Sequence, residues 1–155
     1  MSGRTNRSAP REAEPRKAAN GHRRCLMCGD RNPWSLGLRF EVDAEGGVSG
    51  RYQADASMQG YDGVLHGGMI CALLDAAMTH CLFSLGIPAV TGDMRVRFLR
   101  SVPCGALVEL KARLVKARPP LYRVSAELSE SMRVAARATA SFMARPDRPE
   151  RENAL

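Results

Sequence analysis

A histidine, two glycines and an aspartate on one stretch of the chain have types and spacing that suggest chemistry. His66, Gly67 and Gly68 stand at the expected start of a long apolar helix, and Asp75 lies in its middle. The first turn of a helix presents free backbone N–H groups at the positive end of its dipole. Because glycines leave the backbone accessible, a substrate oxygen can approach these groups, as in an oxyanion hole that polarises a carbonyl.

Asp75 is the charged residue in the middle of this apolar helix. Because burying a lone carboxylate is costly, Asp75 is either a structural residue bonded to the backbone or to Thr79, or a catalytic carboxylate at the wall of a cleft. Its nine-residue separation from His66 corresponds to about 13 Å along a helix. If both residues act on one substrate, Asp75 must come from a neighbouring copy of the chain. The helix therefore predicts a site at a subunit interface.

The helix that positions these residues is predicted from Gly67 to just before Gly86, with Pro88 beyond its end. Its apolar residues recur at three- and four-residue spacing and fill most of the circumference, which is typical of a buried helix. The length almost suffices to span a bilayer. Asp75 and the charged, strand-like sequence that follows favour a soluble core helix instead.

Strand patterns flank the helix on both sides. Alternating residues predict a strand from Ser35 and a second one over about 48–55 before the helix. After the helix, strands are predicted over 90–102, 106–116, 121–128 and 133–144, the last two as a hairpin, with Gly92 at a bulge. This order predicts an α+β domain in which one sheet of five to six strands wraps around the helix. An exposed sheet edge or face needs a cover, which favours a dimer.

Composition limits the organisation of the chain to one domain. The 155 residues carry a net charge of +7, of which residues 1–24 supply +5 from six Arg and one Lys against two Glu. We expect residues 1–24 to be a disordered basic arm, 25–144 to be the domain, and 145–155 to be a charged tail. The scarcity of aromatic residues argues against nucleic-acid binding. Five cysteines and no apolar leader favour the cytoplasm.

A second candidate group is the H-x2-C-x2-C sequence of His22, Cys25 and Cys28. A structural zinc site usually needs a fourth ligand, and no second C-x2-C pair is present. The favoured interpretation is therefore a tight turn that starts the domain, with Gly29 among its turn residues, and no metal.

Three segments resemble one known family. The segment QGYDGVLHGGMICALLDAAM (59–78) looks like the signature of the PaaI-like, phenylacetate-pathway branch of hot-dog-fold acyl-CoA thioesterases. The segments 90–102 and 25–40 are similar to other stretches of that family. The resemblance covers about 25–144 and implies a hot-dog fold, dimers and often tetramers, and hydrolysis of an acyl-CoA thioester.

The resemblance also implies roles for individual residues. The Gly67 N–H would bind the thioester oxygen, with His66 orienting the loop, and the partner chain's Asp75 would be a general base or nucleophile. Thr91 matches a position where a family Ser or Thr assists the water. Gly60 stands where some relatives have Asn, and Ala76 stands where many have an acidic residue.

The resemblance also implies that Gly60 lines the substrate side of the site. Gly68 is expected there because it keeps side chains away from the helix start, and Arg95, Arg97 and Arg100 are candidates for the phosphates of CoA, with a solvated strand face as the alternative. A thioester is already activated, so no metal or redox cofactor is called for.

Two other functions within the same fold remain open. One is an acyl-CoA-binding protein without turnover. The other is hydration of an enoyl-CoA, but Asp75 and His80 lie about 140° apart around the helix and do not converge. His80 is therefore predicted to be a satisfied core or interface residue. The absence of a G-x-S-x-G sequence argues against a serine hydrolase.

Overall fold

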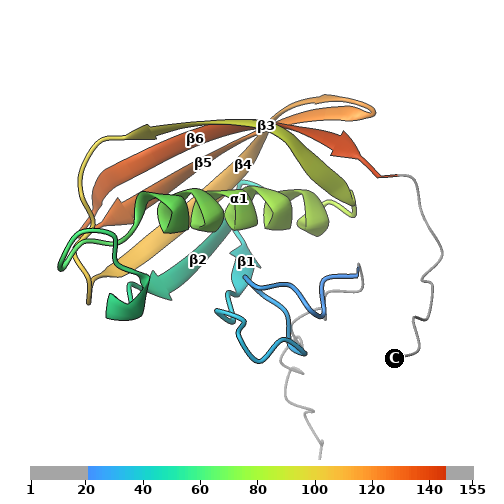
Figure 1. Ribbon diagram of the computed structural model, residues 1–155. Coiled ribbons are helices and arrows are strands. Elements are labelled where there is room, and N and C mark those ends of the chain that lie inside the picture. Colours follow the sequence, from blue (N-terminus) through green and yellow to red (C-terminus); the bar gives the residue numbers. More distant parts are fainter. Residues whose placement is uncertain (1–20, 146–155) are drawn as a thin grey trace, which may run out of the picture.

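The computed structural model describes residues 21–145 of the chain. Within this range a single long helix, α1, lies across one face of a six-stranded antiparallel sheet (Figure 1). The elements follow in the order β1 (Phe40–Val42), β2 (Val48–Gln53), the 3-10 helix η1 (Ala56–Met58), α1 (Gly67–Ser84), β3 (Ala89–Phe98), β4 (Leu107–Arg118), β5 (Leu121–Glu130) and β6 (Arg133–Ala144). The predicted α+β architecture, with one helix and a sheet of five to six strands, is confirmed.

The strand order in the sheet is β1-β2-β4-β5-β6-β3. Strand β3 returns from the helix to the far side of β6, so that it forms one edge of the sheet, whereas β4, β5 and β6 follow as hairpins. The predicted bulge at Gly92 is confirmed, because the register with β6 shifts between Thr91 and Asp93. The carboxylate of Asp93 accepts a 3.0 Å hydrogen bond from the Ser141 N–H across this bulge.

Helix α1 forms the centre of the core. Eight of its residues are buried, and Leu73, Leu74 and Met78 have no measurable exposure. Burying such side chains stabilises the fold by about 1.5–3 kcal/mol each. The helix ends as predicted, with Gly86 at a φ of +73°, a conformation that favours glycine. Although its length and hydropathy would suffice to cross a membrane, α1 packs here against the inner face of the sheet.

The first predicted strand is wrong in extent, because β1 begins at Phe40 and not at Ser35. Gly37 has a φ of +65°, which interrupts extended backbone. The N–H groups of Leu36 and Leu38 donate instead to carbonyls of the turn at residues 25–28. The alternating apolar residues therefore reflect burial on one side of a loop rather than a strand of the sheet.

The third predicted strand also ends early, at Phe98 rather than at residue 102. The N–H groups of Leu99 and Arg100 both donate to the Ala135 carbonyl, so the chain turns away from the ladder there. Most of the predicted basic arm and charged tail lies outside the described residues. Of the arm, His22 and Arg23 already make contacts with the domain, since the Arg23 carbonyl accepts from the Arg31 N–H and the His22 ring packs on Phe83.

Candidate active site

His66 caps the N-terminus of α1. Its backbone is extended, and its Nδ1 accepts a 2.8 Å hydrogen bond from the Gly68 N–H. Since a backbone N–H can only donate, Nδ1 is the acceptor in this bond. This cap satisfies one of the free N–H groups of the first helical turn.

The glycines around His66 are required by close packing. A Cβ on Gly68 would lie 2.9 Å from Nδ1 of His66, and a Cβ on Gly60 would lie 3.2 Å from its Cδ2. The ring is therefore held between two positions where a side chain would displace it. The Gly60 N–H itself donates to the Val64 carbonyl and is not available to a substrate.

Gly67 presents the free donor of the helix start. Within residues 21–145 its N–H makes no hydrogen bond, whereas the following N–H is capped by His66. A Cβ at this position would come no closer than 3.6 Å to the ring of Phe98. The geometry thus leaves one unpaired backbone N–H beside an exposed aromatic ring at the end of β3, as an oxyanion-binding site requires.

Asp75 is paired with Thr91. The Thr91 hydroxyl on β3 donates a 2.6 Å hydrogen bond to Oδ1 of the carboxylate, which is half-buried. The predicted structural alternative, a bond to Thr79 or to the backbone, is not found among the described residues. The structure thereby brings together two residues of the predicted site, Asp75 and Thr91. The other carboxylate oxygen of Asp75, Oδ2, makes no hydrogen bond within residues 21–145.

The two halves of the site lie at opposite ends of β3. Gly67 neighbours Phe98 near the end of this strand, and Asp75 bonds to Thr91 near its beginning. Because α1 is continuous from Gly67 to Ser84, Asp75 lies about 12 Å from Gly67 along the helix axis. One chain alone therefore does not bring the free N–H and the carboxylate to a single carbonyl group.

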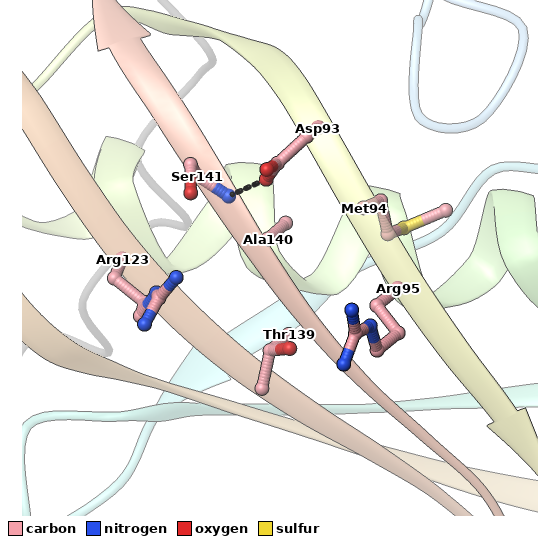
Figure 2. Close-up of a pocket in the computed structure, with 7 residues that line it drawn as sticks. All are labelled: Asp93, Met94, Arg95, Arg123, Thr139, Ala140 and Ser141. Atoms are coloured by element: carbon pink, nitrogen blue, oxygen red, sulfur yellow. Dashed lines mark hydrogen bonds between the residues drawn. The ribbon is translucent and has the colours of Figure 1, made fainter.

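Two of the three predicted phosphate-binding arginines, Arg95 and Arg97, lie apart from this site. Met94 and Val96 pack toward the core, so the alternation of β3 places Arg95 and Arg97 on the sheet face opposite α1. There Arg95 and Arg123 line a groove of about 450 Å³ together with Asp93 (Figure 2). Arg100 follows the end of β3 and is exposed.

His80 is not the satisfied residue that the sequence predicts. Its Nε2 is buried and has no hydrogen-bond partner among the described residues. The centroid of the His80 ring lies 4.7 Å from the ring centroid of Phe40 and 5.6 Å from that of Phe83. Burial, followed by the positive charge of His22 and Arg39, lowers the pKa of His80 to about 4, so the ring is neutral at pH 7.

Sequence reasoning missed the role of Phe98 and the distinct positions of the glycines. No role was assigned to Phe98 from the sequence. Its placement over Gly67 follows from the crossing of β3 and α1, which the strand pattern does not encode. The Asp75–Thr91 bond depends on the same crossing, and the apolar run of the helix gave no signal for it.

Comparison with known proteins identifies the family. The sequence model that describes the thioesterase superfamily matches residues 62–131 of this chain. A phenylacetic acid degradation-related protein from Ralstonia eutropha is 30% identical, with 70% of this chain and 85% of that chain covered and a TM-score of 0.64. A variant of the phenylacetic acid degradation protein PaaI from Thermus thermophilus is 27% identical, with coverages of 70% and 93% and a TM-score of 0.64.

The chain therefore belongs to the thioesterase superfamily, and its predicted resemblance to PaaI-like hot-dog proteins is confirmed. It is also 26% identical to the acyl-coenzyme A thioesterase THEM4 of Rattus norvegicus, over 73% of this chain and 52% of that protein. The chain thus spans about half the length of this curated relative.

Proposed function

We propose that this protein is an acyl-CoA thioesterase whose active site forms between two copies of the chain. The observation that carries the proposal is the unpaired Gly67 N–H beside a capped helix start, with Asp75 held by Thr91 at the other end of the same strand. Membership of the thioesterase superfamily and the similarity to an acyl-coenzyme A thioesterase support this assignment.

In this proposal, the Gly67 N–H donates to the thioester oxygen and stabilises the negative charge that develops there. The partner chain's Asp75 acts either as a general base, which takes a proton from the water that attacks the carbonyl carbon, or as a nucleophile that attacks this carbon itself and forms an anhydride that water then hydrolyses. In either case the carbon–sulfur bond breaks, and CoA leaves as the thiol after it takes up a proton. The overall reaction consumes one water and yields a free acid, so it needs no cofactor.

The edge strand supports assembly through β3. This strand pairs with β6 on one side only, and its exposed residues include Val90, Phe98 and the following Leu99. A two-fold dimer that joins two β3 edges in antiparallel fashion would place the Asp75 end of one strand beside the Gly67 end of the other. Such a dimer would cover the free edge and complete both sites. We also propose that two such dimers assemble into a tetramer and that the protein is cytoplasmic.

For the CoA phosphates, we assign Arg100 ahead of Arg95 and Arg97. Arg100 follows Phe98, which neighbours the free Gly67 N–H, whereas the other two arginines lie on the sheet face opposite α1. A guanidinium suits phosphate because its donors match the spacing of the oxygens.

The experiment is release of free thiol from a panel of aryl, short-chain and long-chain acyl-CoAs. We expect turnover of at least one class by the wild type, and a loss of about 10²- to 10⁴-fold in Asp75→Asn with CoA binding retained. Asp93→Asn is the matched control, because Asp93 is on the outer groove and its amide variant can still accept from Ser141. No release from any substrate would favour a binding protein without turnover, and undiminished turnover in Asp75→Asn would contradict the proposed role.

A further inference from the structure

The turn at residues 22–28 brings three potential metal ligands together on the far side of the domain from the helix start. One ligand atom from each of His22, Cys25 and Cys28 lies within 4.8 Å of the other two. The Cys28 Sγ and the His22 Nδ1 are 3.8 Å apart. We propose that these three residues bind a zinc ion and that a water molecule completes its tetrahedral coordination, in place of the fourth protein ligand that a structural site usually has.

The separation of the Cys28 and His22 ligand atoms fits a tetrahedral zinc site. With a zinc–sulfur bond of about 2.3 Å and a zinc–nitrogen bond of about 2.05 Å, sulfur and nitrogen ligands are about 3.6 Å apart and two sulfur ligands about 3.8 Å apart. The observed 3.8 Å between Cys28 and His22 is close to the first value. Thiolate and imidazole together are a ligand set that suits zinc.

The backbone of the turn holds Cys25 and its sulfur atom in place. The Met27 N–H donates to the Cys25 Sγ at 3.3 Å, and the Gly29 N–H donates to the Cys25 carbonyl at 2.9 Å. A Cβ on Gly29 would lie 2.5 Å from the Cys25 nitrogen, so only glycine fits there. An N–H that points at a sulfur stabilises the thiolate form that a metal requires.

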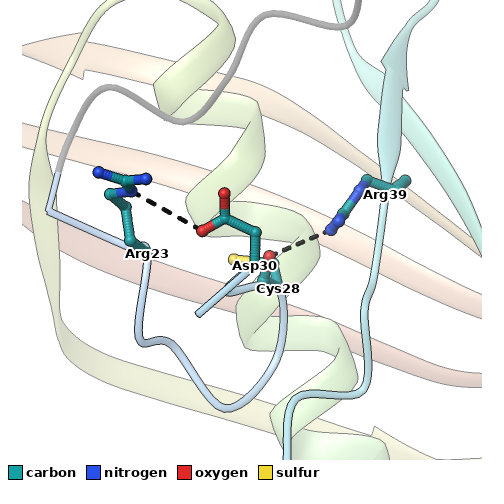
Figure 3. Close-up of polar contacts among 4 residues, drawn as sticks. All are labelled: Arg23, Cys28, Asp30 and Arg39. Carbon is teal, nitrogen blue, oxygen red and sulfur yellow. Dashed lines mark hydrogen bonds and ion pairs between the residues drawn. The ribbon is translucent and has the colours of Figure 1, made fainter. Parts of the chain in front are cut away.

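Charged side chains hold the same turn in place (Figure 3). The Arg39 guanidinium donates to the Cys28 carbonyl at 3.1 Å, and Arg23 lies 3.9 Å from the Asp30 carboxylate. Cys28 itself is 8% exposed, whereas His22 and Cys25 are half-buried, so solvent can reach the fourth position.

A reactive dithiol is the competing interpretation of this pair. A histidine beside the two cysteines favours the metal, because its Nδ1 lies 3.8 Å from the Cys28 Sγ and supplies a third ligand that thiol exchange does not need. Zinc binding displaces the thiol protons into solvent, so that each bound cysteine becomes a thiolate. The three residues together are therefore better suited to holding a metal than to thiol exchange.

The role of the metal would be structural. The His22 ring packs edge-on against Phe83 at 4.7 Å, so the turn rests on the C-terminal end of α1. A zinc ion would connect this histidine to both cysteines and fasten the turn to the helix. Gly67 lies at the start of α1, whereas His22 contacts Phe83 near the other end of the helix. Loss of the zinc ion is therefore compatible with retained thioesterase activity.

The test is metal content and spectroscopy of the full chain, prepared without a metal-binding tag, in reducing buffer and with zinc in the growth medium. We expect stoichiometric zinc in the wild type, a thiolate-to-metal charge-transfer band with cobalt, and a melting temperature that rises with added zinc. Cys25→Ser should abolish all three, and His22→Ala should weaken zinc binding by more than about tenfold.

Cys104→Ser is the matched control, because Cys104 is also half-buried but lies outside the cluster. Its zinc content should equal that of the wild type. Substoichiometric zinc with no cobalt band in folded wild-type protein would overturn the proposal. Equal zinc in Cys25→Ser, or a Cys25–Cys28 disulfide in protein prepared under reducing conditions, would overturn it as well.

Discussion

The Thr91 hydroxyl donates a 2.6 Å hydrogen bond to Oδ1 of Asp75, although sixteen residues separate the two in the sequence. The bond joins the edge strand β3 to the middle of α1 and fixes one oxygen of the carboxylate. In the proposed site we therefore expect Thr91 to position Asp75, since its hydroxyl proton is donated to the carboxylate and not to a water molecule.

Removing this hydroxyl should lower the rate without a comparable change in substrate binding. We expect Thr91→Val to reduce kcat by roughly ten- to a hundredfold, the equivalent of one hydrogen bond to a charged group. KM should change little, and Thr91→Ser should restore most of the rate. Steady-state kinetics of the three proteins checks this, and a rate in Thr91→Val equal to that of the wild type would exclude a positioning role.

The Gly67 N–H can be removed with little disturbance of the helix. Gly67 is the first helical residue, where proline is well tolerated, and His66 has a φ of −61° and a ψ of 135°, as the residue before a proline prefers. We expect Gly67→Pro to lose about 10²- to 10³-fold in kcat.

Gly67→Ala is the control for the proline variant. It keeps the N–H, and its Cβ would meet Phe98 at an ordinary contact distance of 3.6 Å. Its kcat should stay within a few-fold of the wild type. If the proline and alanine variants are equally active, the oxyanion role of this N–H is wrong.

The His66 cap makes a separable contribution to stability. His66→Ala should lower the free energy of unfolding by about 1 kcal/mol, whereas His66→Asn should retain most of it, because Asn is a good N-cap. Denaturant unfolding of both variants tests this, and equal losses would contradict the capping role. An inactive but stable Asn variant would show that the histidine ring does more than cap the helix.

His80 should make stability depend on pH in the acid range. Its pKa is about 4 in the folded protein against 6.5 for an unperturbed histidine, so the unfolded chain binds more protons between these values. The contribution of His80 to the free energy of unfolding should therefore be fully present above pH 6.5, and this free energy should fall by about 3 kcal/mol as the pH drops toward 4.

In His80→Phe this contribution to the pH dependence should disappear, since no titrating ring remains beside Phe40 and Phe83. Thermal unfolding in EDTA at several pH values, with both proteins, measures the difference. Identical pH profiles would show that His80 is not held neutral.

Much of the fold could be predicted from periodicity and turn residues. The limits of α1, the bulge at Gly92 and the hairpin of β5 and β6 follow from local sequence, because glycine conformations and alternation are local properties. The loop at residues 35–39 was misassigned because burial on one side gives the same alternation as a strand. Gly37 was the signal against a strand, because a glycine tolerates the positive φ that interrupts extended backbone.

The site was predictable in its residues but not in its contacts. A free helix start at Gly67 and an isolated carboxylate at Asp75 follow from residue type and helix geometry alone. The Thr91 bond, the stacking of Phe98 over Gly67, and the outward placement of Arg95 all depend on how β3 crosses α1. This crossing is set by packing between segments far apart in the sequence, which no local pattern encodes.

The most direct test of a shared active site is to mix two inactive variants. Asp75→Asn and Gly67→Pro are unfolded together, refolded as a mixture and assayed on the best acyl-CoA. If each site takes its N–H from one chain and its carboxylate from the other, random pairing restores about one quarter of the wild-type activity. If the two groups act within a single chain, the mixture stays as inactive as its components, and the central claim is wrong.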